Sequence, residues 1–248
     1  MSTLLLRFAA PMQSWGSRSK YETRYTDRAP TKSGVIGLLA SALGWRRDCD
    51  LTPLSSGLRF GVRVDRPGNL EVDYHTAKGE KPYISKRHYL CDAIFLVGLE
   101  GDTPLLEKLD AALKAPAFPL FLGRRSCPPE GQLNLGIAYG KSLQQALEEH
   151  PLLYSPRYRS EDPIECRILM DVEKQDDIGY YQRDLPISFN LAGRKYDYRK
   201  VKEYHIKKNP EGIHFQTQSH DGSDDIEDSD NESSSHDAFA ALESILPE

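Results

Sequence analysis

The stretch that decides the fold runs from residue 3 to residue 16 and reads TLLLRFAAPMQSWG. Its first half, residues 3–9, is a short apolar run that predicts a buried strand. A second stretch, PTKSGVIGLLASALG at residues 30–44, places apolar residues at helical spacing over 35–43. The chain is therefore expected to begin with a strand, a loop and a helix.

The loop between this strand and helix is both cationic and aromatic. It contains Arg18, Lys20, Arg24, Arg28 and Lys32, interleaved with Trp15, Tyr21 and Tyr25. Such a composition suits a phosphate backbone with unstacked bases. A solvated surface loop has the same composition, so both interpretations stay open. Trp15 either stacks on a flipped base or fills the core beneath the loop.

The start of the helix is a candidate anion site. Thr31 or Ser33 is expected to be the N-cap, and Lys32 lies in the first turn beside free backbone N–H groups. The helix also carries a stripe of small residues, namely Gly34, Gly37, Ser41 and Gly44. This stripe allows a close approach, either of a packed sheet or of a bound ligand.

Further along the chain the pattern predicts an α+β fold. Strands are expected at 58–65, 89–100 and 118–122, with a protruding hairpin at 71–90 and an amphipathic helix from Thr103 to Pro116. The resulting βαββαβ order is the ferredoxin-like arrangement, in which two helices cover one face of an antiparallel sheet. The other face is expected to be free to bind, as in RNA-recognition modules.

The second half of the chain is less regular. A ferredoxin-like domain is expected at 1–140 and a C-terminal extension at 141–210, with a helix at 142–150, a strand at 165–172 and a strand pair at 189–206. Residues 211–248 are expected to form an acidic, largely disordered tail with a short helix at 237–246. This tail either mimics nucleic acid over the basic body or only maintains solubility.

Net charge differs sharply between these parts. The whole chain has a formal charge of −5, but residues 211–248 contain eleven Asp or Glu and no Lys or Arg. The first 210 residues thus hold all 32 basic residues against 26 acidic ones, a net charge of +6. This asymmetry favours a polyanionic partner for the body.

Composition excludes several classes of protein. No apolar run is long enough for a membrane span, and no signal-peptide pattern opens the chain. The four cysteines show no metal-binding or disulfide spacing. We therefore expect a cytoplasmic protein with no cofactor, no metal and no membrane partner.

Five motifs in the same order resemble a known family. They are LR with PMQSWG (6–16), PTKSG with GLL (30–39), DYHT (73–76), YLCDA (89–93) and LGRRSCP (122–128). Together they are similar to the CasD-type subunit of type I-E CRISPR Cascade, which belongs to the RAMP superfamily. The similarity is firm over the first half of the chain and weakens after about residue 140.

The resemblance implies a ferredoxin-like body with a thumb-like hairpin at 71–90. It also implies binding of the 5′ handle of CRISPR RNA, contact with the oligomer of backbone subunits and with the large subunit, and only indirect contact with target DNA. A separate subunit cuts the precursor RNA in this branch, so the resemblance implies a non-catalytic role in antiviral defence.

The candidate RNA-binding residues lie in four segments. They are Met12, Gln13, Ser14, Trp15, Arg24 and Arg28; Thr31, Lys32 and Ser33; Tyr74, His75, Lys86 and Arg87; and Gly123, Arg124, Arg125 and Ser126. Two other functions stay open. One is a metal-independent endoribonuclease using Tyr74, His75 and Lys78 as acid and base groups. The other is a stand-alone RRM-like RNA-binding protein.

Overall fold

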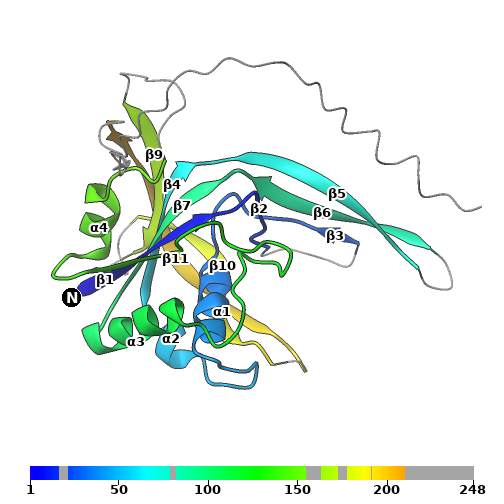
Figure 1. The fold of residues 1–248 in the computed structure, drawn as a ribbon, viewed down its shortest axis with the longest axis horizontal. Coiled ribbons are helices and arrows are strands. Elements are labelled where there is room, and N and C mark those ends of the chain that lie inside the picture. The colour runs from blue at the N-terminus through cyan, green and yellow to red at the C-terminus, as the bar shows by residue number, and fades with distance from the viewer. Residues whose placement is uncertain (17–21, 79–81, 155–162, 173–177, 191, 210–248) are drawn as a thin grey trace, which may run out of the picture. The chain divides into compact units, whose positions relative to one another are not determined.

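A computed structural model describes residues 1–16, 22–78, 82–154, 163–172, 178–190 and 192–209 (Figure 1). The helices are α1 (Lys32–Ala42), α2 (Thr52–Ser55), α3 (Thr103–Lys114) and α4 (Leu143–Glu149). The strands are β1 (Ser2–Ala9), β2 (Met12–Gln13), β3 (Thr23–Arg24), β4 (Arg59–Arg66), β5 (Asn69–Ala77), β6 (Tyr83–Cys91), β7 (Ile94–Gly101), β8 (Asn134–Ala138), β9 (Ile164–Asp171), β10 (Tyr180–Ser188) and β11 (Lys195–Lys208). The expected tail, 211–248, lies outside the described residues.

Seven strands form the main sheet, in the order β10-β11-β9-β4-β7-β1-β8. Every neighbouring pair in it is antiparallel, so the described chain has an α+β fold built on antiparallel strands. β1 lies between β7 and β8, and its side chains alternate between two buried layers. Leu4, Leu6 and Phe8 face a core that includes residues of α1 and α3, whereas Leu5 belongs to a second core with α4.

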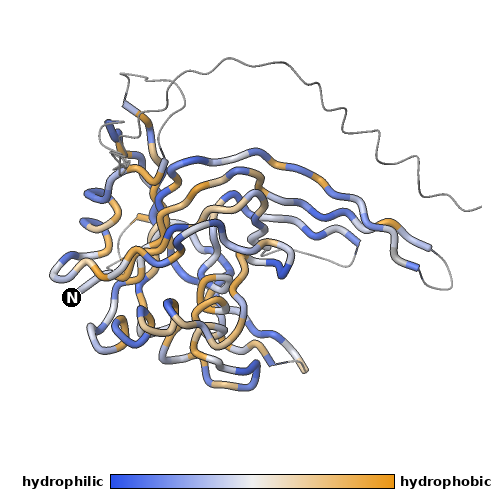
Figure 2. Tube along the Cα trace, viewed as in Figure 1, coloured by the Kyte–Doolittle hydropathy of each residue, from blue (hydrophilic) through white to orange (hydrophobic). Residues whose placement is uncertain are grey.

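The layers follow from this alternation. Figure 1 shows α1, α2 and α3 on one side of the sheet and α4 on the other. Apolar residues concentrate where these elements meet, and the long hairpin β5–β6 is more hydrophilic (Figure 2). None of the helices within the described ranges combines the length and the apolarity that crossing a membrane requires.

Local signals for the helices are confirmed. Thr31 is the N-cap of α1, and its hydroxyl accepts a hydrogen bond from the N–H of Gly34. Ser142 caps α4 in a capping box, since its hydroxyl bonds the N–H of Gln145 while the Gln145 side chain bonds the N–H of Ser142. A strand also forms at β9, and residues 180–188 of β10 pair with residues 195–201 of β11, whereas the strand pair was expected at 189–206.

Three expectations about the sheet are wrong. Residues 118–122, which lie within the described part of the chain, form no strand, and β8 takes the edge position beside β1 instead. The apolar stretch 89–100 is not one strand, because Asp92 adopts a φ of 56° between β6 and β7. The opposite face of the sheet is not free, because Leu143, Ala146 and Leu147 of α4 pack on it beside Leu5 and Leu96.

Candidate nucleic-acid interface

The basic loop folds against the hairpin. β5 pairs with β6 along its whole length, so β2 and β3 lie on the other edge of β6. Here Gln13 is opposite Leu90, and Arg24 is opposite Arg87. Cationic residues that are 63 positions apart in the sequence thus become neighbours on one small sheet.

Three of the candidate residues in the loop have buried side chains that hold the loop on the core. Gln13, Ser14 and Trp15 are at most 3% exposed. The Trp15 ring stacks on Phe8 with centroids 5.4 Å apart, and its indole N–H donates to Gln13 Oε1 at 3.2 Å. Gln13 Nε2 donates to the carbonyl of Ala93 at 2.8 Å. These buried side chains support the loop from the core, and the Trp15 ring takes the core role of the two considered for it.

A glycine turn joins a second basic segment to the loop. Gly123 has a φ of +87°, and a Cβ atom there would lie 1.7 Å from the carbonyl oxygen of Ser14. The N–H of Ser14 in turn donates to the carbonyl of Leu122 at 3.2 Å. Only glycine allows so close an approach. The segment 123–126 therefore meets the loop through a tight turn and not, as expected, through the end of a strand.

Arg124 connects this turn to both neighbours. Its Nη2 donates to the carbonyl of Arg24 at 2.9 Å, and its guanidinium lies 4.6 Å from the ring centre of Tyr89 on β6. Its Nη1 is buried and has no hydrogen-bond partner among the described residues. The Nε of Arg87 is likewise buried and has no hydrogen-bond partner among the described residues. Two cationic donors at this junction thus have no acceptor within the described part of the chain.

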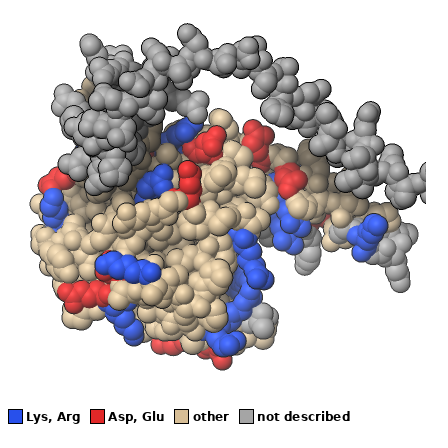
Figure 3. Space-filling view, in the orientation of Figure 1, with Lys and Arg blue, Asp and Glu red and all other residues tan. Residues whose placement is uncertain are grey.

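Exposed cations and aromatic rings surround the junction. Arg24, Arg125 and Lys86 are exposed, as is Ser126. Tyr25 stacks on His88 with ring centres 4.9 Å apart, and Tyr74 is 63% exposed with Lys86 Nζ 5.9 Å from its ring centre. Figure 3 shows Lys and Arg side chains along the hairpin and down the adjoining edge of the body.

A cavity of about 520 Å³, here called the loop cleft, opens beside this junction. Its lining includes Ser14, Gly16, Arg24, Ser33, Gly34, Gly37, Ser41, Arg46, Arg47, Gly123, Arg125, Arg194 and Tyr196. Part of the small stripe of α1 thus lines a cleft, and Gly34 also leaves room for Trp15, which a Cβ would approach to 3.0 Å. Arg46 and Arg47 were missed among the candidate residues, although a basic pair directly after the helix was a signal.

Lys32 and the helix N-terminus do not form the expected anion site. Lys32 is 5% exposed, and its Nζ donates to the carbonyl of Leu58 at 2.8 Å and to Asp171 Oδ2 at 3.0 Å. Its backbone N–H donates to Asp184 Oδ2 at 2.8 Å. A carboxylate of the protein already occupies the position that an anion would take. Thr31 is also buried as the N-cap, and both Thr31 and Ser33 line the loop cleft.

The same carboxylates belong to a buried ion cluster of Lys32, Asp171, Asp184 and Arg199. Arg199 donates Nε and Nη2 to Asp184 at 2.6 and 3.0 Å, and Nη1 to Asp171 at 2.7 Å. Burial alone would raise the pKa of Asp171, but Lys32 and Arg199 lower that pKa below its usual value. The cluster therefore ties α1 to β9, β10 and β11.

The structure does not bring the candidate catalytic residues together. Tyr74 and His75 are neighbours in β5, so their side chains project from opposite faces of the hairpin. Tyr74 shares its face with Lys86, directly opposite, while the His75 imidazole bonds the carboxylate of Asp73 on the other face. Lys78 follows the strand and is exposed.

Comparisons with known proteins agree with this architecture. The protein family described as CRISPR-associated protein (Cas_Cas5) matches residues 3–202. The CRISPR system Cascade subunit CasD of Escherichia coli (strain K12) is 38% identical over 169 residues, which cover 59% of this chain and 75% of that protein.

Solved structures give the same result. A chain of a structure titled CRISPR RNA-guided surveillance complex superposes with a TM-score of 0.70 at 29% identity, covering 84% of this chain and 91% of the other. A structure titled Crystal structure of Cas protein gives a TM-score of 0.69 at 41% identity, covering 85% and 98%. The resemblance to CasD-type subunits is confirmed, and the chain belongs to the CRISPR-associated Cas5 protein family.

Proposed function

We propose that this protein is a non-catalytic subunit of a Cascade surveillance complex and that it binds the 5′ handle of the CRISPR RNA. One observation carries the proposal: the loop, the hairpin strand β6 and the turn 123–126 converge, so that Arg24, Arg87 and Arg124 meet beside exposed tyrosines. Phosphate contacts from such cations position RNA, and stacking selects unpaired bases.

The topology supports a ferredoxin-like interpretation of the body. The central strands follow the order β4-β7-β1-β8, with α1 between β1 and β4 and α3 between β7 and β8. We assign this βαββαβ unit to residues 1–140, with 141–210 as an extension that adds α4 and three strands. The hairpin is the thumb of this arrangement, and the backbone and large subunits are the proposed protein partners, with target DNA reached through the complex.

The first test measures how RNA binding depends on salt. RNA made from the host's CRISPR repeat is labelled, and its affinity for the full chain is measured by fluorescence anisotropy at several KCl concentrations. Arg24→Ala with Arg125→Ala is expected to weaken binding about tenfold and to reduce the salt slope by about 0.7 for each phosphate that is no longer neutralised. Lys108→Ala, on the exposed side of α3, is the matched control and should leave the slope unchanged. An unchanged slope in the double variant would contradict phosphate contact at the junction.

The second test addresses cleavage. The protein is incubated with the same RNA in EDTA, and we expect no specific cut, because Tyr74 and His75 project from opposite faces. Burial raises the pKa of the Cys127 thiol, which is the opposite of what an activated nucleophile requires. A specific cut that His75→Ala abolishes and Tyr139→Ala preserves would overturn the non-catalytic assignment.

A further inference from the structure

A second cavity lies on the far side of the loop segment that precedes α1. Its volume is about 760 Å³, within the range of small-ligand sites, and it opens between residues 27–30 and strands β4, β9, β10 and β11. We call it the arginine–tyrosine cleft, after Arg28, Arg167, Arg183, Tyr180, Tyr181 and Tyr198. Arg28 was a candidate from the sequence, and Tyr198 lies in the strand pair expected at 189–206.

The cleft carries unbalanced positive charge. Arg199 on its wall is neutralised by Asp171 and Asp184, and Arg167 lies 3.5 Å from Glu203. Arg28 and Arg183, by contrast, have no hydrogen-bond or ion-pair partner among the described residues. Asp27 is the acidic residue in the lining. The free cations therefore favour an anionic ligand.

Aromatic and apolar surface accompanies these cations. Tyr181 and Tyr198 are 67% and 58% exposed. Phe60, Val62 and Leu169 line the floor. Exposed rings beside arginines form a stacking platform for unpaired bases, which need no defined sequence for such contacts.

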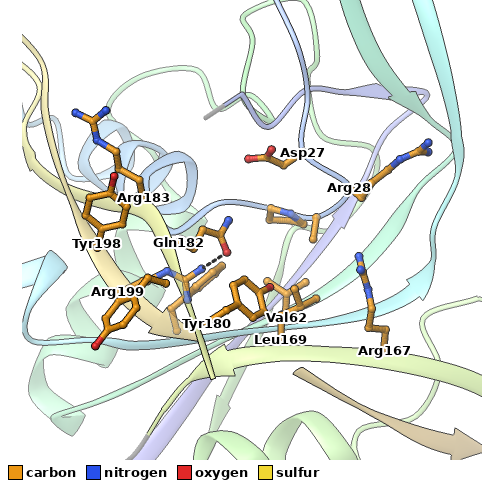
Figure 4. A pocket seen from close by; sticks show the side chains of 14 residues that line it. Asp27, Arg28, Val62, Arg167, Leu169, Tyr180, Gln182, Arg183, Tyr198 and Arg199 are labelled. Carbon is orange, nitrogen blue, oxygen red and sulfur yellow. Dashed lines mark hydrogen bonds between the residues drawn. The ribbon is translucent and has the colours of Figure 1, made fainter. Parts of the chain in front are cut away.

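The arrangement of the groups suits one nucleotide within a strand. Figure 4 shows Arg183 with Tyr198 at one end of the cleft and Arg28 with Arg167 at the other, while Val62 and Leu169 lie between them. A nucleotide in a chain has a phosphate on either side and an apolar base face between. The two ends of the cleft match the phosphates, and the floor matches the base.

The position of the cleft connects it to the loop cleft. The segment 24–34 contributes Arg24, Ser33 and Gly34 to the loop cleft, and 27–30 to the arginine–tyrosine cleft. We propose that the arginine–tyrosine cleft binds one unstacked nucleotide of the same RNA strand, which crosses this shared wall. The proposal rests on the proposed function and adds a second site on the C-terminal strands, which belong to the extension expected at 141–210.

The test combines crosslinking with affinity measurements on the full chain. Repeat RNA carrying 5-iodouridine is irradiated with the protein, because this base crosslinks to aromatic rings on which it stacks, and crosslinked peptides are identified by mass spectrometry. We expect crosslinks at Tyr181 or Tyr198. Arg183→Ala with Tyr198→Ala should weaken binding of the repeat RNA about tenfold, because the double variant can neither stack on the base nor neutralise the phosphate at that end.

The control is Tyr139→Ala, which removes a tyrosine of similar exposure, 61%, beyond β8. It should bind as the wild type does, and near-ultraviolet circular dichroism should show that each variant is folded. If the wild type binds the RNA but crosslinks fall only on the hairpin, and the double variant keeps its affinity, the second site is refuted and the proposed function stands. A wild type that binds no repeat RNA would overturn both.

Discussion

Replacing Arg199 by methionine is expected to lower the free energy of unfolding by about 3–5 kcal/mol. The methionine keeps much of the side-chain volume, but it leaves Asp171 and Asp184 buried with only Lys32 to balance them. Removing one partner of a buried cluster exposes the remaining charge to the full cost of desolvation. Urea unfolding at neutral pH, followed by circular dichroism, measures the change.

The matched control is Arg167→Met. Arg167 also pairs with a carboxylate on the same sheet, but it and Glu203 are each 32% exposed, so its removal should cost less than about 1 kcal/mol. Equal destabilisation in the two variants would show that burial of the Arg199 cluster contributes nothing to stability.

Acid titration tests the same cluster independently. The folded protein lowers the pKa of Asp171 below 3.8, so this stabilisation is complete above about pH 4 and is lost as the pH falls through the lower, folded value. In the methionine variant Asp171 loses one of the two cations that lower its pKa. The difference in unfolding free energy between wild type and variant should therefore be constant near neutrality and shrink below about pH 4.

The second large effect is expected at Gly123. In Gly123→Ala the new Cβ would overlap the carbonyl oxygen of Ser14 at 1.7 Å, in a backbone conformation that alanine rarely adopts. The turn must move away from the loop, which separates Arg124 from the carbonyl of Arg24. We expect stability to fall by about 3–4 kcal/mol and affinity for repeat RNA to fall at least tenfold.

Gly136→Ala isolates the steric part of this effect. Gly136 has nearly the same φ, +90°, but nothing lies within 4 Å of a Cβ atom there. The free energy of unfolding of the Gly136→Ala variant should fall by about 1 kcal/mol because of backbone strain, and the variant should retain its affinity for RNA. If Gly123→Ala behaves like this control, the contact with Ser14 does not organise the junction.

Local patterns were sufficient for much of the fold. The apolar run of β1 and the helical spacing of α1 each act within a few residues, so they can be read from the sequence. The segment 118–122 shows the limit of such reading. In this apolar run Leu122 is buried but Phe118 is 40% exposed, and whether such a run pairs as a strand depends on which edge of the sheet is vacant. β8 occupies that edge.

In the candidate site, too, the sequence predicted some features and the tertiary structure decided others. The sequence identified the basic and aromatic segments, but not which of their side chains reach solvent. Arg24 and Arg125 do, whereas Trp15 and Lys32 do not. Arg183 was missed because its partners in the cleft include residues from segments far away in the chain.

The sequence by itself determined the family, the first strand and helix, the hairpin and the basic character of the loop between them, because these depend on residue type and on spacing over short distances. Tertiary structure alone decided that Trp15 packs on Phe8 and that Lys32 pairs with Asp171. It also decided that Gly123 lies against Ser14. The reason is that the residue type is the same whether its side chain faces RNA or the interior of the protein. For Lys32, the approach of Asp171 and Asp184, more than a hundred positions away, selects between the two.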